Sequence, residues 1–354
     1  MSLPFITIGE RRIGADFPAY IVAELSGNHN GDLGRAIETV HAAADAGADA
    51  LKLQTYTADT ITIKCDRPDF IVGGTGPWGG MSLHELYDVA HTPWDWHERL
   101  FDVAASRGLQ IFSTPFDATA VDFLSQLGAP AFKIASFEIV DDALLVAVAA
   151  TGKPIILSTG MASLEEVAHA ISVLRTAGAV ETLVLRCTSS YPAPDDSMHL
   201  STLGRLAEIT EGPVGLSDHS LGSTAAVVAV TLGACFIEKH FTLSRADGGV
   251  DSHFSLEPSE FREMVDDVRR AEAMIGRPTF GPGVAEEGSA VFRRSLYVVE
   301  DIAAGMPLTP LNVRSIRPGF GMSPRYLDAV LGRRVVRDVV RGTPLSWDTI
   351  SDAS

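Results

Sequence analysis

Residues 214–241 read VGLSDHSLGSTAAVVAVTLGACFIEKHF and contain a complete strand–helix–strand unit. We predict that Val214–Ser217 ends one buried strand, that Thr224–Leu232 forms a short crossover helix, and that Cys235–Lys239 forms the next strand. Neighbouring strands of a parallel sheet lie about 4.8 Å apart, with their carboxyl ends at the same edge. Side chains that follow these two strands are therefore expected to meet.

The two side chains expected to meet there are His219 and His240. Imidazole suits first-row transition ions, and two protein ligands leave coordination positions open for substrate and water. A histidine at a strand end is also common as a hydrogen-bonded packing residue, and Asp218 is an alternative functional group beside His219. The pairing of two histidines across one βα unit favours a divalent metal site.

Short β-branched runs alternate with longer helical patterns over most of the chain. Strands are predicted at 20–24, 51–54, 110–113, 131–134, 154–158, 182–186, 213–217 and 235–239. Eight strands alternating with helices over about 250 residues predict an α/β fold, the (β/α)8 or TIM barrel. An open doubly wound sheet is the main alternative, but no glycine-rich dinucleotide fingerprint follows the first strand.

Two domains are predicted. We assign residues 1–275 to the barrel and residues 276–287 to a linker, because the sequence GRPTFGPG at 276–283 is rich in glycine and proline. Residues 288–354 contain short apolar runs between turn signals, which predict a small, compact, β-rich domain.

An insertion interrupts the barrel pattern at residues 56–87. It is rich in glycines and aromatic residues, notably GGTGPWGG at 73–80. A long insertion after a barrel strand typically forms a lid or a substrate wall, although a surface hairpin is the alternative.

The composition argues against several kinds of partner and compartment. With 28 Lys and Arg against 45 Asp and Glu, the formal net charge of -17 disfavours nucleic acid or an anionic membrane as the main partner. The longest apolar run, Ala225–Ile237, is shorter than the roughly 20 residues of a membrane span, and no secretory signal pattern is present. Cys65, Cys187 and Cys235 do not suggest a disulfide framework. We therefore expect a cytoplasmic protein.

Charged residues stand at several predicted strand ends, where TIM barrels place their active sites. Lysines inside a barrel mouth are costly to bury without an anion, so Lys52 and Lys133 indicate a phosphate or carboxylate ligand. The alternative is a structural ion pair with Glu24 or Glu138.

Hydroxyl groups accompany these lysines. Thr114, Ser136 and Ser158 are placed to complete a phosphate-binding site together with the helix amino termini that follow their strands, although each is also a suitable helix cap. Gln54 lies two residues after Lys52, so both side chains are expected on one face of the strand, pointing inward.

Several ordered motifs resemble the sialic acid synthase family. They are AELSGNHN at 23–30, LKLQ at 51–54, STPF at 113–116, FKIAS at 132–136, LSTGM at 157–161, YP at 191–192, SDHS at 217–220 and EKHF at 238–241. IRPG at 316–319 resembles the antifreeze-like (SAF) carboxyl-terminal domain of that family. Within the family, WGGMSLHELY at 78–87, TPWDWH at 92–97 and GVDSHFSLEP at 249–258 are most similar to the pseudaminic acid synthase branch.

This resemblance implies a reaction. The branch condenses phosphoenolpyruvate with the aldehyde of 2,4-diacetamido-2,4,6-trideoxy-L-altrose, giving a nine-carbon 2-keto acid and phosphate. N-acetylneuraminate and legionaminate synthases are the nearest alternatives. A barrel that condenses phosphoenolpyruvate with phosphorylated aldoses, a metal-dependent aldolase, and a non-enzymatic glycan- or ice-binding protein are more distant ones.

The resemblance also implies site roles. His219 and His240 would hold a divalent ion, Mn²⁺ or alternatively Mg²⁺ or Co²⁺, that polarises the aldehyde. Phosphoenolpyruvate would be bound by Lys52, Thr114, Lys133, Ser136, Ser158 and Ser189. Glu24 and Gln54 would face the reacting carbons or the metal-bound water, and Glu138 would transfer a proton.

Tyr191 and Asp251 would bind the sugar. Arg317 would reach the sugar from the partner subunit, since the family forms domain-swapped homodimers in which the small domain caps the neighbouring barrel.

Overall fold

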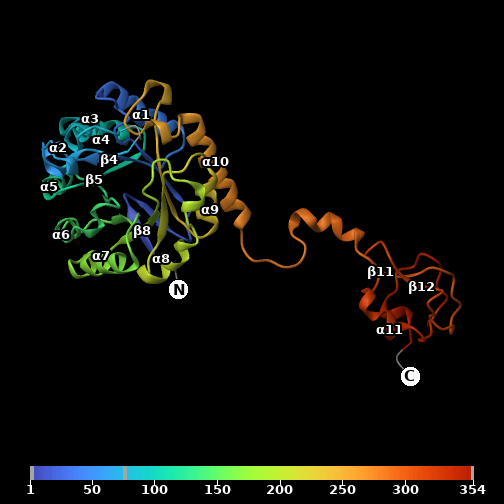
Figure 1. Ribbon diagram of the computed structural model, residues 1–354. Helices are drawn as coiled ribbons and strands as arrows, with labels where there is room; N and C mark the ends of the chain where they lie inside the picture. The colour runs from blue at the N-terminus through green and yellow to red at the C-terminus, as the bar shows by residue number, and fades with distance from the viewer. Residues whose placement is uncertain (1–3, 75–77, 352–354) are drawn as a thin grey trace. The chain divides into compact units, whose positions relative to one another are not determined.

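The computed structural model describes residues 4–74 and 78–351. The chain divides into two compact units, Met1–Gly276 and Arg277–Ser354, each described here by itself. In the first unit, eight parallel strands close into a barrel in the order β10-β3-β4-β5-β6-β7-β8-β9 (Figure 1). The TIM barrel predicted from the alternation is therefore confirmed.

The barrel strands agree with the predicted strands to within two residues. They are β3 (Tyr20–Glu24), β4 (Ala50–Thr55), β5 (Gln110–Pro115), β6 (Phe132–Ile134), β7 (Ile155–Ser158), β8 (Thr182–Cys187), β9 (Val214–Asp218) and β10 (Phe236–His240). The helices that alternate with them are α1 (Leu33–Asp45), α4 (His97–Ser106), α5 (Ala118–Gln126), α6 (Asp142–Ala149), α7 (Leu164–Thr176), α8 (Thr202–Thr210), α9 (Thr224–Thr231) and α10 (Pro258–Ile275).

Local sequence signals set the ends of these helices. At the start of α7, the Ser163 side chain accepts a hydrogen bond from the Glu166 backbone N–H, while the Glu166 carboxylate accepts one from the Ser163 N–H. Gly178 follows the helix with a φ of 96°, a left-handed conformation in which glycine carries no Cβ penalty. The chain can therefore turn directly into β8.

Two apolar clusters build the barrel unit. The larger cluster lies between the strands and the surrounding helices, and includes Val40, Leu53 and Phe261. The smaller cluster fills the barrel interior and includes Ile6 and Ile13 from an amino-terminal hairpin, β1 (Phe5–Ile8) and β2 (Arg11–Gly14). Because these apolar side chains occupy the interior, the polar residues gather at the carboxyl ends of the strands.

The insertion between β4 and α4 contains two short helices, α2 (Ala58–Ile61) and α3 (Leu83–Ala90), and a 3-10 turn, η1 (Pro68–Phe70). Val72 is hydrogen-bonded to Gly80 and Met81 through the backbone, so a hairpin-like turn precedes α3. Residues 75–77 of the glycine-rich stretch 73–80 lie outside the described residues.

The second unit is a small domain with little regular structure. The strands β11 (Ser295–Val298) and β12 (Val313–Ile316) pair in antiparallel fashion, and isolated bridges hold much of the remaining chain. Its helical elements are η7 (Val284–Phe292), η8 (Pro324–Tyr326), α11 (Leu327–Val330) and η9 (Trp347–Thr349). A separate apolar core, which includes Leu296, Val330 and Leu345, stabilises this unit. Within the described residues of the chain, no helix is both long and apolar enough to cross a membrane.

The close packing of β9 gives a first prediction. A Cβ at Gly215 would lie 2.5 Å from the Phe236 carbonyl oxygen and 2.7 Å from Leu185 Cδ2, so the barrel must shift to admit one. We expect Gly215→Ala to lower the free energy of unfolding by about 1–3 kcal/mol, as overpacking does. Urea unfolding followed by circular dichroism would measure it.

Gly204 supplies a matched control. It lies on α8, and a Cβ there would meet no atom within 4 Å. Gly204→Ala should therefore raise stability by about 0.4–1 kcal/mol, because alanine restricts the unfolded chain. Equal unfolding curves for the two variants would contradict the close packing around Gly215.

Candidate active site

A cavity of about 460 Å³ opens at the carboxyl ends of the barrel strands. The predicted site residues that line it are Glu24, Lys52, Gln54, Lys133, Ser136, Glu138, Ser158, Tyr191, His219, His240 and Asp251. These side chains belong to the barrel strands or to the loops that follow them. The folded barrel therefore brings most of the predicted site together.

Three predicted residues do not line this cavity. Thr114 is buried on β5, where its hydroxyl accepts a hydrogen bond from Lys52 Nζ at 3.1 Å. Ser189 lies beside the loop that follows β7, and a Cβ at Gly160 would be only 2.6 Å from its Oγ. Arg317 belongs to the second unit, and its contact with a partner subunit stays a prediction.

Two lysines and two glutamates form a buried charge network. Lys52 Nζ lies 2.5 Å from Glu24 Oε2 and 3.6 Å from Glu238 Oε1. Lys133 Nζ lies 3.9 Å from the same Glu238 oxygen and donates a hydrogen bond to Ser158 Oγ at 2.6 Å. The predicted alternative of a structural ion pair with Glu24 is thus realised for Lys52.

Lys133 is the less compensated of the two ammonium groups. Burial lowers the pKa of Lys133 despite the attraction of Glu238. For Lys52, burial acts in the same direction, but Glu238 and Glu24 outweigh it and raise the pKa. A buried, incompletely paired ammonium group favours an anionic ligand.

A hydrogen-bonded chain runs from Glu24 across the cavity. Gln54 Nε2 donates to Glu24 Oε1 at 2.9 Å and to Ser26 Oγ at 3.1 Å, and the Ser26 hydroxyl donates to Asp251. Burial raises the pKa of Glu24 to about 7, although Lys52 opposes this rise. Glu24 can therefore hold or release a proton near neutral pH.

The two histidines meet as the opening stretch predicts. Their ring centroids are 5.3 Å apart. His219 Nδ1 donates to the Thr188 carbonyl at 3.0 Å, so Nε2 is the nitrogen left for a ligand, whereas His240 Nδ1 is buried without a hydrogen-bond partner. Burial, followed by the charge of His219, lowers the pKa of His240 well below its ordinary value.

A neutral imidazole with a free nitrogen is the form that binds a metal, and the lowered pKa keeps His240 in that form. Burial lowers the pKa of His219 too, but Cys187 and the Thr188 carbonyl outweigh it and raise the pKa, so His219 would bind a metal after losing a proton. Across residues 4–74 and 78–351, no group of three or more His, Cys, Asp or Glu side chains is arranged to hold a metal. The structure brings the two predicted ligands together, and a metal held by them, with the other positions left to substrate and water, stays a prediction.

Asp218, the alternative to His219, points away from the cavity. It forms an ion pair with Lys239 at 2.7 Å, and both side chains have 0% exposure. The Ser220 N–H and hydroxyl also donate to its carboxylate. Asp218 therefore has a structural role, and the strand parity separates it from the functional face.

The segment between β4 and α4, which contains the predicted insertion 56–87, supplies one wall of the cavity. Its lining side chains are mainly apolar: Tyr56, Ile61, Val72, Trp78, Leu83, Leu86, Tyr87 and Ala90. The described part of the insertion therefore lines the cavity, and the hairpin pairing at Val72 belongs to this wall, while its contact with substrate stays a prediction.

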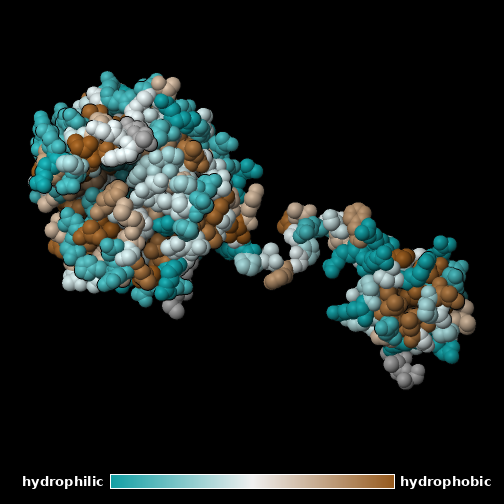
Figure 2. Space-filling view, in the orientation of Figure 1, coloured by the Kyte–Doolittle hydropathy of each residue, from teal (hydrophilic) through white to brown (hydrophobic). Residues whose placement is uncertain are grey.

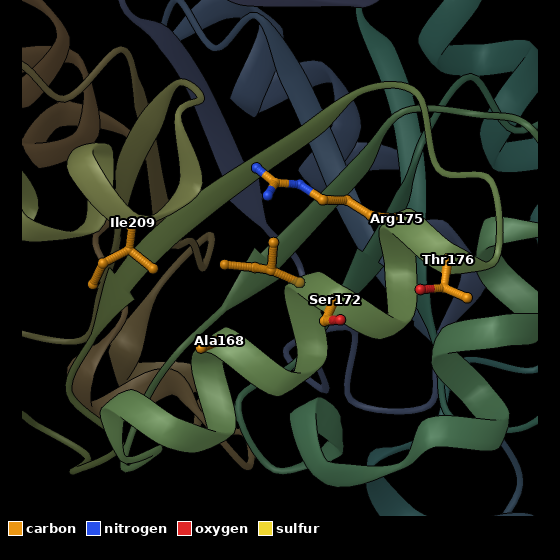
Figure 3. Close-up of a pocket in the computed structure, with 6 residues that line it drawn as sticks. Ala168, Ser172, Arg175, Thr176 and Ile209 are labelled. Atoms are coloured by element: carbon orange, nitrogen blue, oxygen red, sulfur yellow. The ribbon is translucent and has the colours of Figure 1, made fainter.

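A smaller cavity of about 270 Å³ lies between α7 and the end of α8 (Figure 3). Ala168, Ile171 and Ile209 contribute apolar surface, and the Arg175 guanidinium donates to the Thr210 carbonyl at 2.8 Å. It has none of the titratable network seen at the strand ends, so the larger cavity is the candidate active site.

Comparison with known proteins identifies the family. Residues 39–279 match the NeuB family, and residues 293–351 match the SAF domain. The chain belongs to the NeuB family. The predicted membership of the sialic acid synthase family, with its SAF domain, is therefore confirmed.

Relatives of this NeuB-family chain carry out related syntheses. It is 42% identical to a pseudaminic acid synthase of Campylobacter jejuni. The aligned 330 residues cover 93% of this chain and 96% of the relative. It is 35% identical over 342 residues to an N,N'-diacetyllegionaminic acid synthase of Legionella pneumophila, covering 95% and 96%. The crystal structure of an N-acetylneuraminic acid synthetase from Leptospira borgpetersenii in complex with citrate matches with a TM-score of 0.72 and 32% identity, covering 80% of this chain and 94% of that one.

Sequence reasoning missed several residues of this NeuB-family cavity. Glu238 was not selected, although it lies two residues before His240 on β10 and therefore shares its face. Cys187 lies 3.8 Å from His219 Nδ1, and although burial opposes it, the charge of His219 lowers the pKa of the thiol to about 7. Ser26 and Ser217 also line the cavity. Strand parity could have found Glu238, whereas nothing in the spacing marks Ser26.

The environment of Glu138 predicts a pH effect on stability. Burial raises the pKa of Glu138 from the ordinary value of 4.5 to about 7, against the attraction of Lys133. Between these values the native carboxyl keeps its proton while the unfolded one loses it, so the free energy of unfolding should fall as pH rises. Glu138→Gln should remove this pH dependence. The free energy of unfolding of the variant, relative to that of the wild type, should be up to about 3 kcal/mol higher at pH 7.5 than at pH 4.5.

Urea unfolding at a series of pH values measures this difference. Parallel pH dependences for the two proteins would show that Glu138 ionises in the folded state as it does in the unfolded chain.

Proposed function

We propose that this NeuB-family chain condenses phosphoenolpyruvate with 2,4-diacetamido-2,4,6-trideoxy-L-altrose, giving a nine-carbon 2-keto acid and phosphate. The observation that carries the proposal is one cavity that combines two buried lysines with two facing histidines. Identity to the Campylobacter pseudaminic acid synthase, which exceeds identity to the Legionella legionaminic acid synthase, supports this choice of sugar.

The proposed reaction joins C3 of phosphoenolpyruvate to the aldehyde carbon of the open-chain sugar. Water supplies an oxygen atom to C2, phosphate leaves, and the aldehyde oxygen takes a proton to become a hydroxyl group. The site must therefore bind an anion of high charge, polarise a carbonyl group and move protons.

We assign the anion to the lysine end of the cavity. Lys133 and Lys52 would bind the phosphate and carboxylate of phosphoenolpyruvate, because both side chains are buried at this end of the cavity and Glu238 compensates Lys133 incompletely. Ser136 and Ser158 line the same part of the cavity and would donate hydroxyl hydrogen bonds. Thr114 would act through Lys52, to which it is hydrogen-bonded.

A divalent ion, Mn²⁺ or alternatively Mg²⁺ or Co²⁺, would be held by His219 and His240. The unpartnered Nδ1 of His240 and the Thr188 contact of His219 support this assignment. Bound there, such an ion would supply Lewis acidity toward the sugar aldehyde.

The remaining residues would handle protons and the sugar. The raised pKa values of Glu24 and Glu138, both about 7, suit groups that exchange protons at neutral pH. Gln54 holds the Glu24 carboxylate in place through its amide. Tyr191 packs on His219 with ring centroids 4.4 Å apart, and Asp251 lies 4.0 Å from His240, so both would contact a sugar bound near the histidines.

The test is phosphate release from phosphoenolpyruvate with Mn²⁺ present. We expect release with the diacetamido altrose, and little with N-acetylmannosamine or with the gluco- and manno-configured diacetamido sugars. Preference for one of those sugars would assign a neuraminate- or legionaminate-type reaction instead. Absence of release with every sugar would contradict the condensation and favour an aldolase or a glycan-binding protein.

We also propose a cytoplasmic homodimer in which Arg317 completes the partner's site. Several large apolar side chains are exposed on the second unit taken by itself, including Leu311, Phe320 and Trp347, and Figure 2 shows hydrophobic residues on its surface. Exposed apolar residues of this size support packing against another surface. The free thiols of Cys65, Cys187 and Cys235 suit a reducing compartment.

Mixing two variants, each with an impaired site, tests this arrangement at a sugar concentration below the KM of Arg317→Ala. Arg317→Ala should raise KM for the sugar more than KM for phosphoenolpyruvate, and His240→Ala should abolish turnover. In a 1:1 mixture that exchanges subunits, each mixed dimer would contain one fully intact site, so activity should return to roughly a quarter of wild type. A mixture no more active than the separate variants, with subunit exchange verified by mass spectrometry, would place Arg317 in its own subunit's site. An Arg317→Ala variant as active as the wild type would place Arg317 outside any site.

A further inference from the structure

The two chemical halves of the cavity come from different parts of the chain. The charged residues stand on barrel strands, as Lys52 does, or in the loops that follow them, as Asp251 does. The apolar residues come mainly from the insertion between β4 and α4. A ligand that fills this cavity therefore meets ionic groups on the strand side and hydrocarbon on the insertion side.

Trp78 connects the insertion to the loops that follow β8 and β10 through side-chain contacts. Its indole Nε1 donates to the Val250 carbonyl at 2.9 Å, next to Asp251. Its ring contacts Tyr191 and His253 edge to face, with centroids 6.0 Å and 6.1 Å apart. Because Tyr191 packs on His219, the Trp78 ring lies one aromatic side chain away from the histidine pair.

The indole of Trp78 cannot easily serve as a polar contact for the ligand. Its one donor is already used by Val250, so the surface left to the cavity is hydrocarbon. Val72 and Leu86 extend this surface within the same insertion. A sugar hydroxyl placed here would lose its water without gaining a partner.

We infer that Val72, Trp78 and Leu86 select for apolar substituents on the acceptor sugar. This inference rests on the proposed function and deepens it. A 2,4-diacetamido-2,4,6-trideoxy sugar carries two N-acetyl methyl groups and a C6 methyl group, whereas N-acetylmannosamine carries hydroxyl groups at C4 and C6. The wall discriminates between the two kinds of sugar by burying methyl groups and leaving hydroxyl groups unpaired.

The test compares kcat/KM for the two kinds of sugar. One methyl-sized contact in an apolar pocket is worth about 10- to 200-fold in specificity. We expect Val72→Ser and Trp78→Ala each to raise KM for the diacetamido trideoxy sugar about tenfold or more, with KM for phosphoenolpyruvate unchanged. The ratio of kcat/KM for the diacetamido trideoxy sugar to kcat/KM for N-acetylmannosamine should fall by a similar factor.

Val89→Ser is the matched control. Val89 lies in the same insertion on α3, but it is 58% exposed and does not line the cavity. This variant should keep both the activity and the preference of the wild type.

The outcomes separate this inference from the proposed function. An active wild type whose sugar preference is unchanged in Val72→Ser and Trp78→Ala would overturn the inference alone. A wild type that releases phosphate with none of the sugars would overturn the proposed function and the inference together. Binding gives a second readout: quenching of tryptophan fluorescence by the diacetamido sugar should be strong in the wild type and largely lost in Trp78→Phe, and equal quenching in both would count against the wall.

Discussion

The site depends on one buried charge network, and that network depends on closure of the barrel. Glu24 and Lys52 are register partners on β3 and β4, so their ion pair follows from one strand pairing. Glu238 contacts Lys52 and Lys133 from β10, the last strand of the barrel. β10 lies beside β3, the first strand of the barrel, only because the sheet closes. An open sheet would separate Glu238 from Lys52 and leave buried charges unpaired, which is costly.

The charge network also fixes where the proposed anion would bind. Burial alone would raise the pKa of Glu238, but Lys133 and Lys52 outweigh it and lower the pKa. Glu238 therefore stays ionised and holds both ammonium groups near the same point. Fixed charges of this kind need little rearrangement when a ligand arrives, which is the main advantage of a preorganised site.

The sequence alone could predict the barrel and the strand-end residues, because both depend on short-range patterns. The period of the apolar runs located the strands, and parallel pairing then placed His219 beside His240. The partner of a buried lysine was harder to predict from the sequence, since Glu238 meets Lys133 through tertiary packing across several strands. The role of the insertion was harder still to predict, because its sequence has no regular hydrophobic period. Its composition indicated a wall but did not show that Val72 and Trp78 would form it.

The division between strands and insertion has a consequence for specificity. The positions of the charged residues are set by strand register, so a substitution among them disturbs the barrel as well as the chemistry. The apolar wall lies on an insertion that contributes nothing to the register, and loops of this kind tolerate change. Relatives named for pseudaminic, legionaminic and neuraminic acid synthesis share this family or fold. A fixed charged end with a variable wall would allow the acceptor sugar to change while the phosphoenolpyruvate end keeps its geometry.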